Sequence, residues 1–187
     1  MNDIIAQTVC VLETGGLILY PTDTVWGIGC DATNETAVQR IFQLKKRADN
    51  KSMIILSASP DDIEPYVDNL SIVHRLLLID NTIPQTVILP KARRLASSVI
   101  PSEQTIAVRC PKHAFCQQLL TVFQKPIVST SANISGETPP TTLSQINPAI
   151  LNGVDLIIPE QYDIGSTHQP SRIVKTDENG LLIILRD

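Results

Sequence analysis

The stretch PIVSTSANISGE, residues 126–137, changes abruptly from apolar to polar. Its first part, Pro126–Ser129, has the short apolar pattern of a buried strand. Small hydrogen-bonding side chains then follow in close succession: Ser129, Thr130, Ser131, Asn133 and Ser135. Hydroxyl and amide groups at the end of a strand are typical of α/β proteins that bind a small polar ligand. The stretch therefore predicts an α/β protein with a binding site at this strand end.

A second stretch, YPTDTVWGIGCDA (Tyr20–Ala32), predicts another wall of the same kind of site. It follows the apolar run Leu17–Leu19, and we expect a loop whose hydroxyls and glycines line a cavity. Its GIGCDA part fits the dinucleotide-binding pattern G-x-G-x-x-A, which requires a strand directly before it and a helix opening on it. Pro21–Trp26 intervenes here, so a Rossmann nucleotide site is disfavoured.

Strand and helix patterns alternate along the rest of the chain. Helical spacing occurs at residues 4–12, 34–44, 72–79, 114–123 and 142–151. Short apolar runs predict strands at residues 17–20, 53–56, 86–89, 105–109, 126–129, 154–158, 172–174 and 181–185. This order predicts a mixed α/β (α+β) protein with a twisted open sheet and flanking helices. With 187 residues and 43% hydrophobic content, we expect a single domain over residues 1–187.

Composition excludes several classes of protein. No apolar run approaches the roughly 18 residues of a membrane span, and the N-terminus lacks a signal-peptide profile, so a soluble, cytoplasmic protein is expected. The four cysteines lack Cys-x-x-Cys spacing and the three histidines are scattered, which predicts buried thiols and no metal site. A net charge of -4 disfavours a surface devoted to nucleic acid, although a local basic pocket stays open.

Cations gather at two places. LKKRADNKS carries Lys45, Lys46, Arg47 and Lys51, which form either a solvated charge run or a polyphosphate site, since the chain has no G-x-x-x-x-G-K-[ST] loop. TIAVRCPKH ends a predicted strand with Arg109, which is either a structural ion-pair partner or an anion ligand. No Ser-x-x-Lys, Lys-Thr-Gly or G-x-S-x-G motif accompanies the serines, so a serine nucleophile is disfavoured.

The order of these segments resembles that of the YrdC-like family of threonylcarbamoyl-AMP synthases. The matching segments run from Tyr-Pro-Thr-x-Thr through Lys-x-Arg, Val-Arg-x-Pro, Ser-Thr-Ser-Ala-Asn-x-Ser-Gly and Pro-Ser-x-Ile-Val to a terminal strand ending in Arg. They cover nearly the whole chain, from Gly16 to Arg186, as in the short members of the family. The resemblance implies a twisted sheet enclosing a basic cavity, in which L-threonine, bicarbonate and ATP yield threonylcarbamoyl-AMP and pyrophosphate.

The resemblance also implies roles for particular residues. Lys45 and Arg47, the Lys-x-Arg pair, are expected to be catalytic. The expected ATP-binding residues are Lys45, Arg47, Lys51, Thr105, Ser131, Asn133 and Arg186. The expected threonine-binding residues are Thr24, Arg109, Ser129 and Ser171. Mg²⁺ is expected to arrive with ATP, held by phosphate oxygens and water. Other enzymes would then transfer the threonylcarbamoyl group to tRNA.

Departures from the family pattern keep alternatives open. Leu56 stands where many synthases carry a threonine-contacting His, and Arg172 replaces a usual Thr. Leu56 is expected to form an apolar niche for the methyl group of threonine, a methyl niche, but to donate no hydrogen bond. Threonine should therefore bind more weakly than in a relative that carries the His. Two other functions remain: a YrdC-like protein that binds double-stranded RNA or tRNA, and an adenylating enzyme acting on another small amine.

Overall fold

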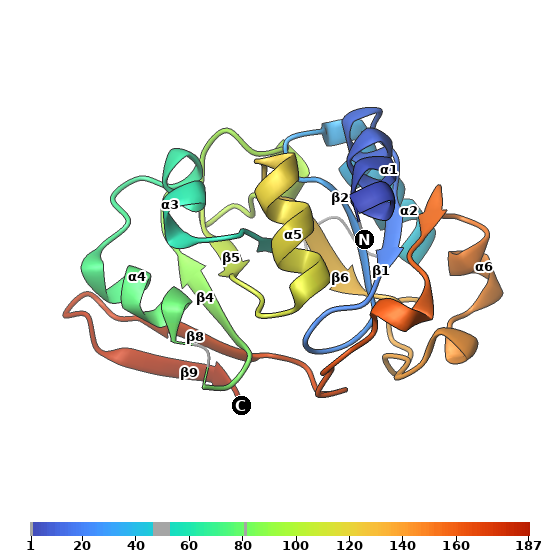
Figure 1. The fold of residues 1–187 in the computed structure, drawn as a ribbon. Helices are drawn as coiled ribbons and strands as arrows, with labels where there is room; N and C mark the ends of the chain where they lie inside the picture. Colours follow the sequence, from blue (N-terminus) through green and yellow to red (C-terminus); the bar gives the residue numbers. More distant parts are fainter. Residues whose placement is uncertain (1, 47–52, 81) are drawn as a thin grey trace.

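The strands of the chain form one mixed sheet (Figure 1). The computed structural model describes residues 2–46, 53–80 and 82–187. Within these residues the sheet has nine strands in the order β7-β1-β2-β6-β3-β5-β4-β8-β9. Three pairs are parallel (β1 with β7, β3 with β5, β4 with β8) and the others are antiparallel, which confirms the predicted mixed sheet.

The strands are β1 (Ile18–Tyr20), β2 (Gly27–Asp31), β3 (Ile54–Leu56), β4 (Gln85–Leu89), β5 (Ile106–Arg109), β6 (Ile127–Ser131), β7 (Leu156–Ile157), β8 (Arg172–Thr176) and β9 (Leu182–Arg186). The α-helices are α1 (Asn2–Glu13), α2 (Glu35–Lys45), α3 (Pro60–Ile63), α4 (Ile72–Ile79), α5 (Ala114–Phe123) and α6 (Pro148–Leu151). Short 3₁₀ turns occupy Glu64–Tyr66, Ser97–Val99, Leu143–Gln145 and Glu160–Tyr162.

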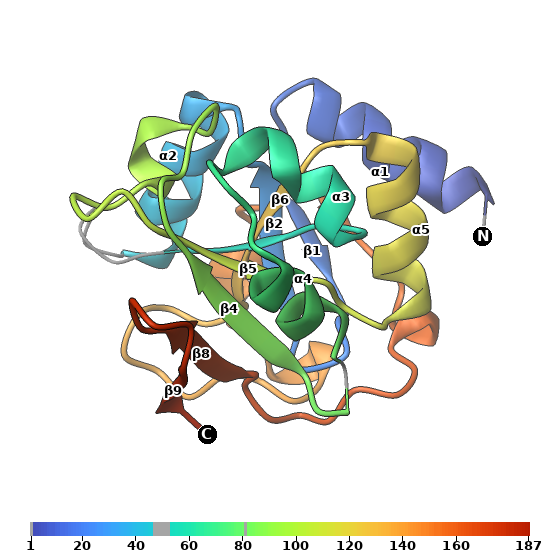
Figure 2. The ribbon, with the colours of Figure 1, turned by 90° about the vertical axis from the view of Figure 1, so that its left-hand side faces the viewer.

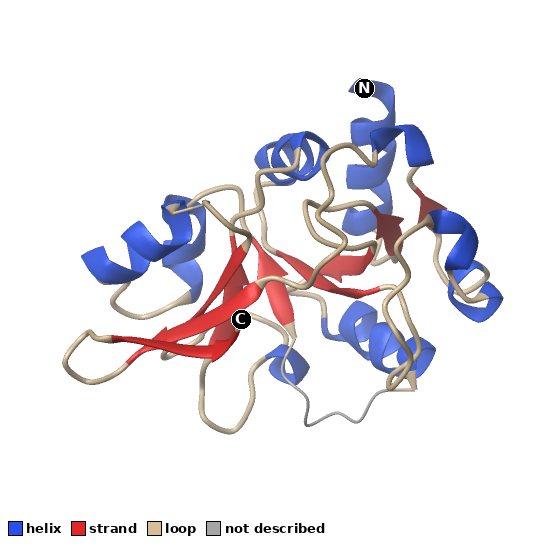
Figure 3. Ribbon diagram, turned by 90° about the horizontal axis from the view of Figure 1, so that it is seen from below, coloured by secondary structure: helices blue, strands red, loops and turns tan. Residues whose placement is uncertain are grey.

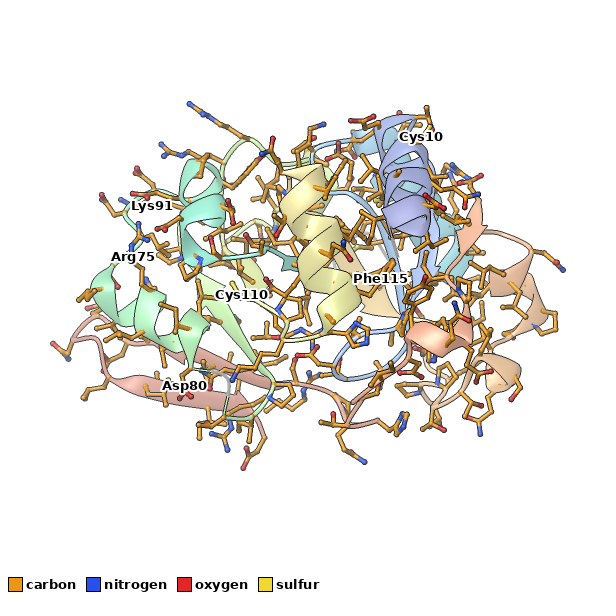
Figure 4. All side chains as sticks on the ribbon, in the orientation of Figure 1. Cys10, Arg75, Asp80, Lys91, Cys110 and Phe115 are labelled. Atoms are coloured by element: carbon orange, nitrogen blue, oxygen red, sulfur yellow. The ribbon has the colours of Figure 1, made fainter. Side chains whose placement is uncertain are left out.

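Helices cover both faces of the central strands (Figure 2). Alternate residues of a strand point to opposite faces, so Ile127 packs beneath α1 and α5 while Val128 packs on the α2 side. Phe115 of α5 lies in the first of these two cores (Figure 4). Seen from below, the sheet runs across the molecule between the helices (Figure 3). Burying both faces explains why these strands are almost continuously apolar.

The largest difference from the sequence prediction is β2, which we expected to be part of a loop. Gly27–Asp31 pairs with β1 on one side and β6 on the other, both antiparallel. Its glycines lower intrinsic strand propensity, and this concealed the strand in the sequence. The true loop is therefore Pro21–Trp26, the turn between β1 and β2.

The predicted helices hold, with one exception. Asn34 caps α2 by accepting from the backbone N–H of Ala37, as its position before the apolar pattern indicated. The continuous helix expected over residues 142–151 is wrong: a 3₁₀ turn ends at Gln145 and α6 begins at Pro148. Proline has no backbone N–H and cannot continue a preceding helix, but it suits the first turn of a new one. Among the described residues, no helix has the length and hydropathy needed to cross a bilayer.

Candidate functional site

A cavity of about 370 Å³ opens where several strands meet the turn between β1 and β2, the loop after β6 and the loop before β8. Its floor is a row of residues paired across adjacent strands: Ser129 of β6 with Ile54 of β3, Ile54 with Ala107 of β5, and Ala107 with Ile88 of β4. Directly paired residues share a face of the sheet, so one polar and three apolar side chains form a continuous surface. The small side chain of Ala107 leaves room at the middle of this floor.

One side of the cavity, which we call the inner wall, is formed by Thr24, Arg109 and Ser129. Arg109 ends β5 with a side chain only 5% exposed, and its Nη1 donates to Asp23 Oδ1 at 2.9 Å and to Thr24 Oγ1 at 2.8 Å. Its Nε has no hydrogen-bond partner among the described residues. The ion-pair interpretation of Arg109 is therefore confirmed, and Arg109 also lines the cavity, while its role as an anion ligand stays a prediction.

The turn between β1 and β2 is fixed by its own hydroxyls and by a distant loop. Thr22 Oγ1 lies 2.8 Å from Thr24 Oγ1 and donates to the carbonyl of Val25. From the loop preceding β8, Ser166 Oγ donates to the Thr22 carbonyl at 2.6 Å. The Nε1 of Trp26 donates to Asp163 Oδ2 at 2.9 Å. The turn is therefore held from both ends before any ligand arrives.

The two glycines of GIGCDA serve different purposes. Gly27 lines the cavity, and a Cβ there would lie 3.2 Å from Ser129 Oγ. Gly29 instead packs beneath the ring of Tyr20, where a Cβ would lie 2.8 Å from the ring. The expectation that both glycines line a ligand site is thus met at Gly27 alone. Burial raises the pKa of Tyr20, so its hydroxyl stays protonated.

The opposite side, which we call the edge wall, is formed by Ser171, Ile173 and Arg186. Arg186 donates from Nε and Nη2 to the carbonyl of Ser171, at 3.1 and 2.6 Å. Arg186 pairs with Ile173, whereas Ile184 pairs with the next residue of β8, Val174, so β9 contains one extra residue. This bulge places Arg186 on the face of Ile173, toward the cavity, and Ile184 on the core face of Val174.

The electrostatics of the cavity favour an anion. Burial, together with the nearby Arg109 guanidinium, lowers the pKa of Arg186. No Asp or Glu is among the described residues that line the cavity, and Asp23 is already paired with Arg109. Two guanidinium groups that disfavour each other's charge are stabilised when a carboxylate or phosphate lies between them.

Most of the predicted site residues come together at this cavity. All four expected threonine-binding residues line it, as do Ser131 and Arg186 of the ATP-binding set. Thr105 lies just before β5 and does not line it. Arg47 and Lys51 lie outside the described residues, so the basic segment is represented here by Lys45 and Lys46.

Lys45 and Asn133 support the strand end from behind the lining. Lys45 is almost fully buried, and its Nζ donates to the carbonyls of Ser131 and Asn133, the latter at 2.6 Å. The Nδ2 of Asn133 donates to the carbonyls of Ile134 and Glu137. In this structure both side chains order the loop after β6, and their predicted contact with ATP stays a prediction.

The sequence prediction missed part of the cavity lining, and it misplaced Leu56, one of the departures from the family pattern. The lining includes Thr22 and Thr130 of the two predicted polar stretches, and it also includes residues that the prediction did not name: Val25, Met53, Ile54, Ile88, Ala107, Pro139, Pro170 and Ile173. Strand pairing reveals most of them, and the sequence alone does not contain it. The methyl niche expected at Leu56 is wrong, because Leu56 packs in the core beneath α5 and does not line the cavity. Arg172 points elsewhere as well, donating to Asp187 at 2.7 Å.

Among the described residues, the cavity lining contains no thiol, and no metal-binding cluster is found. Burial raises the pKa of Cys110 to about 12 and raises those of Cys30 and Cys116, so these thiols are poor nucleophiles. Cys10 is exposed on α1, at the surface of the molecule (Figure 4). In residues 2–46, 53–80 and 82–187, no three His, Cys, Asp or Glu side chains gather in a way that would hold a metal ion.

Comparisons with known proteins identify relatives in sequence and in fold. The chain is 35% identical over 170 residues to the threonylcarbamoyl-AMP synthase of Vibrio vulnificus, covering 89% of this chain and 90% of that protein. Its fold is similar to P. abyssi Sua5 complexed with L-threonine, with a TM-score of 0.85, 28% identity and 97% coverage of this chain. It spans 53% of that Sua5 chain, about half its length.

E. coli YciO is similar over its length, with a TM-score of 0.81, 25% identity, and coverage of 100% of this chain and 90% of YciO. The family model Sua5_yciO_yrdC, described as "Telomere recombination", matches residues 10–187. A match of this extent shows that the chain belongs to the Sua5/YciO/YrdC family.

Proposed function

We propose that this protein is a nucleotidyltransferase that makes L-threonylcarbamoyl-AMP and pyrophosphate from L-threonine, bicarbonate and ATP. The observation that carries the proposal is the single cavity that joins the hydroxyls and guanidinium of the inner wall to Ser131 and Arg186. A zwitterionic amino acid beside a polyanion requires such a combination of hydroxyl and guanidinium donors. The name of the Vibrio vulnificus relative supports the same activity.

The reaction has two bond-forming steps. The threonine amine attacks the carbon of bicarbonate and releases water, which leaves an N-carboxylate. An oxygen of that carboxylate attacks the α-phosphorus of ATP, and the bond between the α-phosphorus and the bridging oxygen breaks as pyrophosphate leaves. Neither step needs a protein nucleophile, so positioning and charge neutralisation are the protein's main contributions.

We assign the inner wall to the amino acid. The guanidinium of Arg109 is fixed by Asp23 and Thr24 and lines the cavity, so it suits the threonine carboxylate. Ser129 and Ser171 line the same cavity and supply hydroxyl groups. The P. abyssi Sua5 structure complexed with L-threonine supports an amino-acid site in this fold.

We assign the nucleotide to the side of Ser131 and Arg186. Lys45, Thr105 and Asn133 are proposed to act there by shaping the adjoining segments or by closing on ATP. Arg47 and Lys51 are proposed as phosphate ligands on the family pattern alone.

Mg²⁺ is best described as part of the Mg–ATP substrate. The donor groups of the cavity are hydroxyls and guanidinium groups, which do not ligate Mg²⁺ as carboxylates do. Phosphate oxygens and water would therefore supply most of its ligands, and Mg²⁺ would neutralise charge on the leaving pyrophosphate.

The product would serve a tRNA modification carried out by other enzymes in the cytoplasm, where threonylcarbamoyl transfer to adenosine takes place. Direct contact with tRNA or double-stranded RNA stays a prediction. The cavity itself is polar at one end and apolar on its floor, which suits a small substrate and a nucleotide.

The decisive experiment is incubation with Mg–ATP, bicarbonate and one amino acid at a time, followed by measurement of pyrophosphate and mass spectrometry of the product. Threonine should give threonylcarbamoyl-AMP, with serine slower by about 5- to 100-fold because one methyl group in a pocket is worth about 1 to 3 kcal/mol. Pyrophosphate release that does not depend on threonine would refute the assignment. Release with another amine, or tight RNA binding without release, would instead support the corresponding alternative.

A further inference from the structure

A completely buried hydroxyl lies directly behind the edge wall. Thr86 of β4 has no exposed surface, and its Oγ1 lies 2.7 Å from the Oγ of Ser171. These two residues are 85 positions apart in the sequence. Thr86 does not line the cavity, whereas Ser171 does. Any effect of Thr86 on a ligand must therefore pass through Ser171.

The parallel pairing of β4 and β8 fixes this contact. Thr86 pairs with Ile173, and the backbone N–H of Arg172 donates to the Pro84 carbonyl at 2.9 Å. The strands β4 and β8 lie side by side (Figure 2). Ser171 therefore enters β8 at a fixed position relative to β4, with its hydroxyl against that of Thr86. Both side chains are buried, so water does not compete strongly for this hydrogen bond.

The direction of this hydrogen bond matters to a ligand. A hydroxyl carries one proton and two acceptor sites. If Thr86 donates to Ser171, the Ser171 proton stays available for an acceptor in the cavity. If Ser171 donates to Thr86, that proton is turned away from the cavity. Ser171 is the hydrogen-bond partner that the described residues provide for Thr86, and a carboxylate in the cavity favours the first arrangement.

We propose that Thr86 is a positioning residue that directs the hydroxyl of Ser171 toward an oxygen of the amino-acid substrate. This rests on the proposed function, since it assumes an amino-acid carboxylate or carboxylate-like group at Ser171. Thr86 donates to Ser171, and Ser171 donates to the substrate, so two hydrogen bonds in series polarise each other.

The nucleotide side should be insulated from this effect. Arg186 is bonded to the carbonyl of Ser171 and not to its hydroxyl. Loss of the Thr86 hydroxyl leaves that backbone contact in place. The proposal therefore predicts a change in amino-acid affinity without a change in ATP affinity.

The test compares Thr86→Val, which keeps the shape and removes the hydroxyl, with Thr86→Ser, which keeps the hydroxyl. Thr8→Val is the matched control, because Thr8 is equally buried and bonds only the Ile4 carbonyl within α1. In Thr86→Val the Kd and KM for L-threonine should rise about three- to tenfold, the range of one hydrogen bond. The kcat at saturating threonine and the Kd for ATP should stay within about twofold.

Thr86→Ser should restore threonine affinity to within about twofold, and Thr8→Val should match the unaltered protein. If a folded Thr86→Val binds threonine as the unaltered protein does, or if ATP affinity falls equally, the proposal is overturned while the synthase assignment stands. If the unaltered protein neither binds threonine nor releases pyrophosphate with it, the proposed function fails and this inference fails with it.

Discussion

The two walls of the cavity are built in contrasting ways. The inner wall stands on β2, β5 and β6, each of which pairs with a strand on both sides. The edge wall depends on β9, the last strand of the sheet, whose five residues are all exposed. On the inner wall, Arg109 is held by a carboxylate and a hydroxyl. On the edge wall, Arg186 is held by one backbone carbonyl.

This difference indicates a division of labour. A wall fixed by its own ion pair and hydrogen bonds is organised before binding and suits discrimination of a small substrate. A wall on an exposed hairpin opens and closes at lower cost, because fewer buried contacts oppose its movement. We therefore expect substitution of Arg109 on the inner wall to act on threonine and substitution of Arg186 on the edge wall to act on ATP, while Ser171 of the edge wall faces the amino acid.

The largest effect is expected at the centre of the inner wall. Arg109→Lys keeps the charge but cannot bond Asp23 and Thr24 while presenting a second donor to a carboxylate. Loss of a bidentate contact should lower kcat/KM for threonine by about 100-fold. Steady-state pyrophosphate release measures this value.

The matched control is Arg75→Lys, which alters an ion pair of α4 with Asp61 and Glu64 and should leave kcat/KM unchanged. A similar loss in both variants, or an Arg109→Lys protein with normal threonine affinity, would remove Arg109 from the amino-acid site.

A smaller effect, on ATP affinity and not on threonine, is expected for the arginine of the edge wall. Arg186→Ala removes a partly buried guanidinium and should weaken ATP by about tenfold, the value of one charge-assisted contact, while threonine stays within about threefold. Calorimetric titration of each ligand measures both affinities. Arg172, on the same hairpin, contacts Asp187 outside the cavity. Arg172→Ala should therefore change neither the ATP affinity nor the threonine affinity. Equal weakening of threonine and ATP by Arg186→Ala would contradict the division between the walls.

Between the walls, Ser131→Ala should reduce turnover by several fold, about the effect of one lost hydrogen bond. Ser131 lines the cavity, and no Asp, Glu or His is among the described residues that line it, so we expect Ser131 to orient substrate without forming a covalent bond. Intact-protein mass spectrometry during turnover should show no acyl or phosphoryl adduct on the unaltered protein. A trapped adduct on Ser129 or Ser131 would establish a different mechanism.

The smallest effect on activity is expected away from both walls, at the start of α2. Burial would raise the pKa of Glu35, but hydrogen bonds from Ser98, Gln39 and Ser97 outweigh it and lower the pKa from 4.5 to about 2. A carboxyl group whose pKa is lower in the folded state stabilises the fold above its unfolded pKa. This contribution is lost as the pH falls from 4.5 to about 2.

Glu35→Gln should therefore lower Tm at neutral pH, and the difference from the unaltered protein should shrink across that pH range. Thermal unfolding by circular dichroism measures it, with exposed Glu103→Gln as the control. A difference in Tm that is independent of pH would show that the charge of Glu35 contributes nothing.

The sequence correctly predicted features that depend on neighbouring residues, and it missed features that depend on strand pairing and packing. Ser129 and Ser131 were predicted because hydroxyls concentrate at a strand end, and Arg109 because a cation follows an apolar run. The strand at Gly27–Asp31 was missed, since glycine is chosen there for the ring of Tyr20, which comes from the neighbouring strand. The position of Leu56 was misjudged because only the packing of α5 shows that it is covered.

Contacts between distant segments were also beyond sequence reasoning. The hydrogen bond of Thr86 with Ser171 depends on a parallel pairing of β4 and β8 that no local pattern specifies. The role of Lys45 is similar, because a basic residue at the end of an amphipathic helix is ordinarily solvated, whereas here its ammonium is buried against two carbonyls.

Because β9 contains a bulge, the number of residues in that strand matters as much as their identity. Surface strands at the end of a sheet usually tolerate gain or loss of a residue. Here Leu185 is the additional residue, and its deletion would remove the bulge while leaving Arg186 paired with Ile173, on the cavity face. A residue inserted after Leu185, with the bulge kept, would instead shift Arg186 by one position against β8 and carry its side chain to the opposite face. Deletion of Leu185 should therefore preserve ATP binding, whereas the insertion should weaken it as Arg186→Ala does, although both variants keep every site residue.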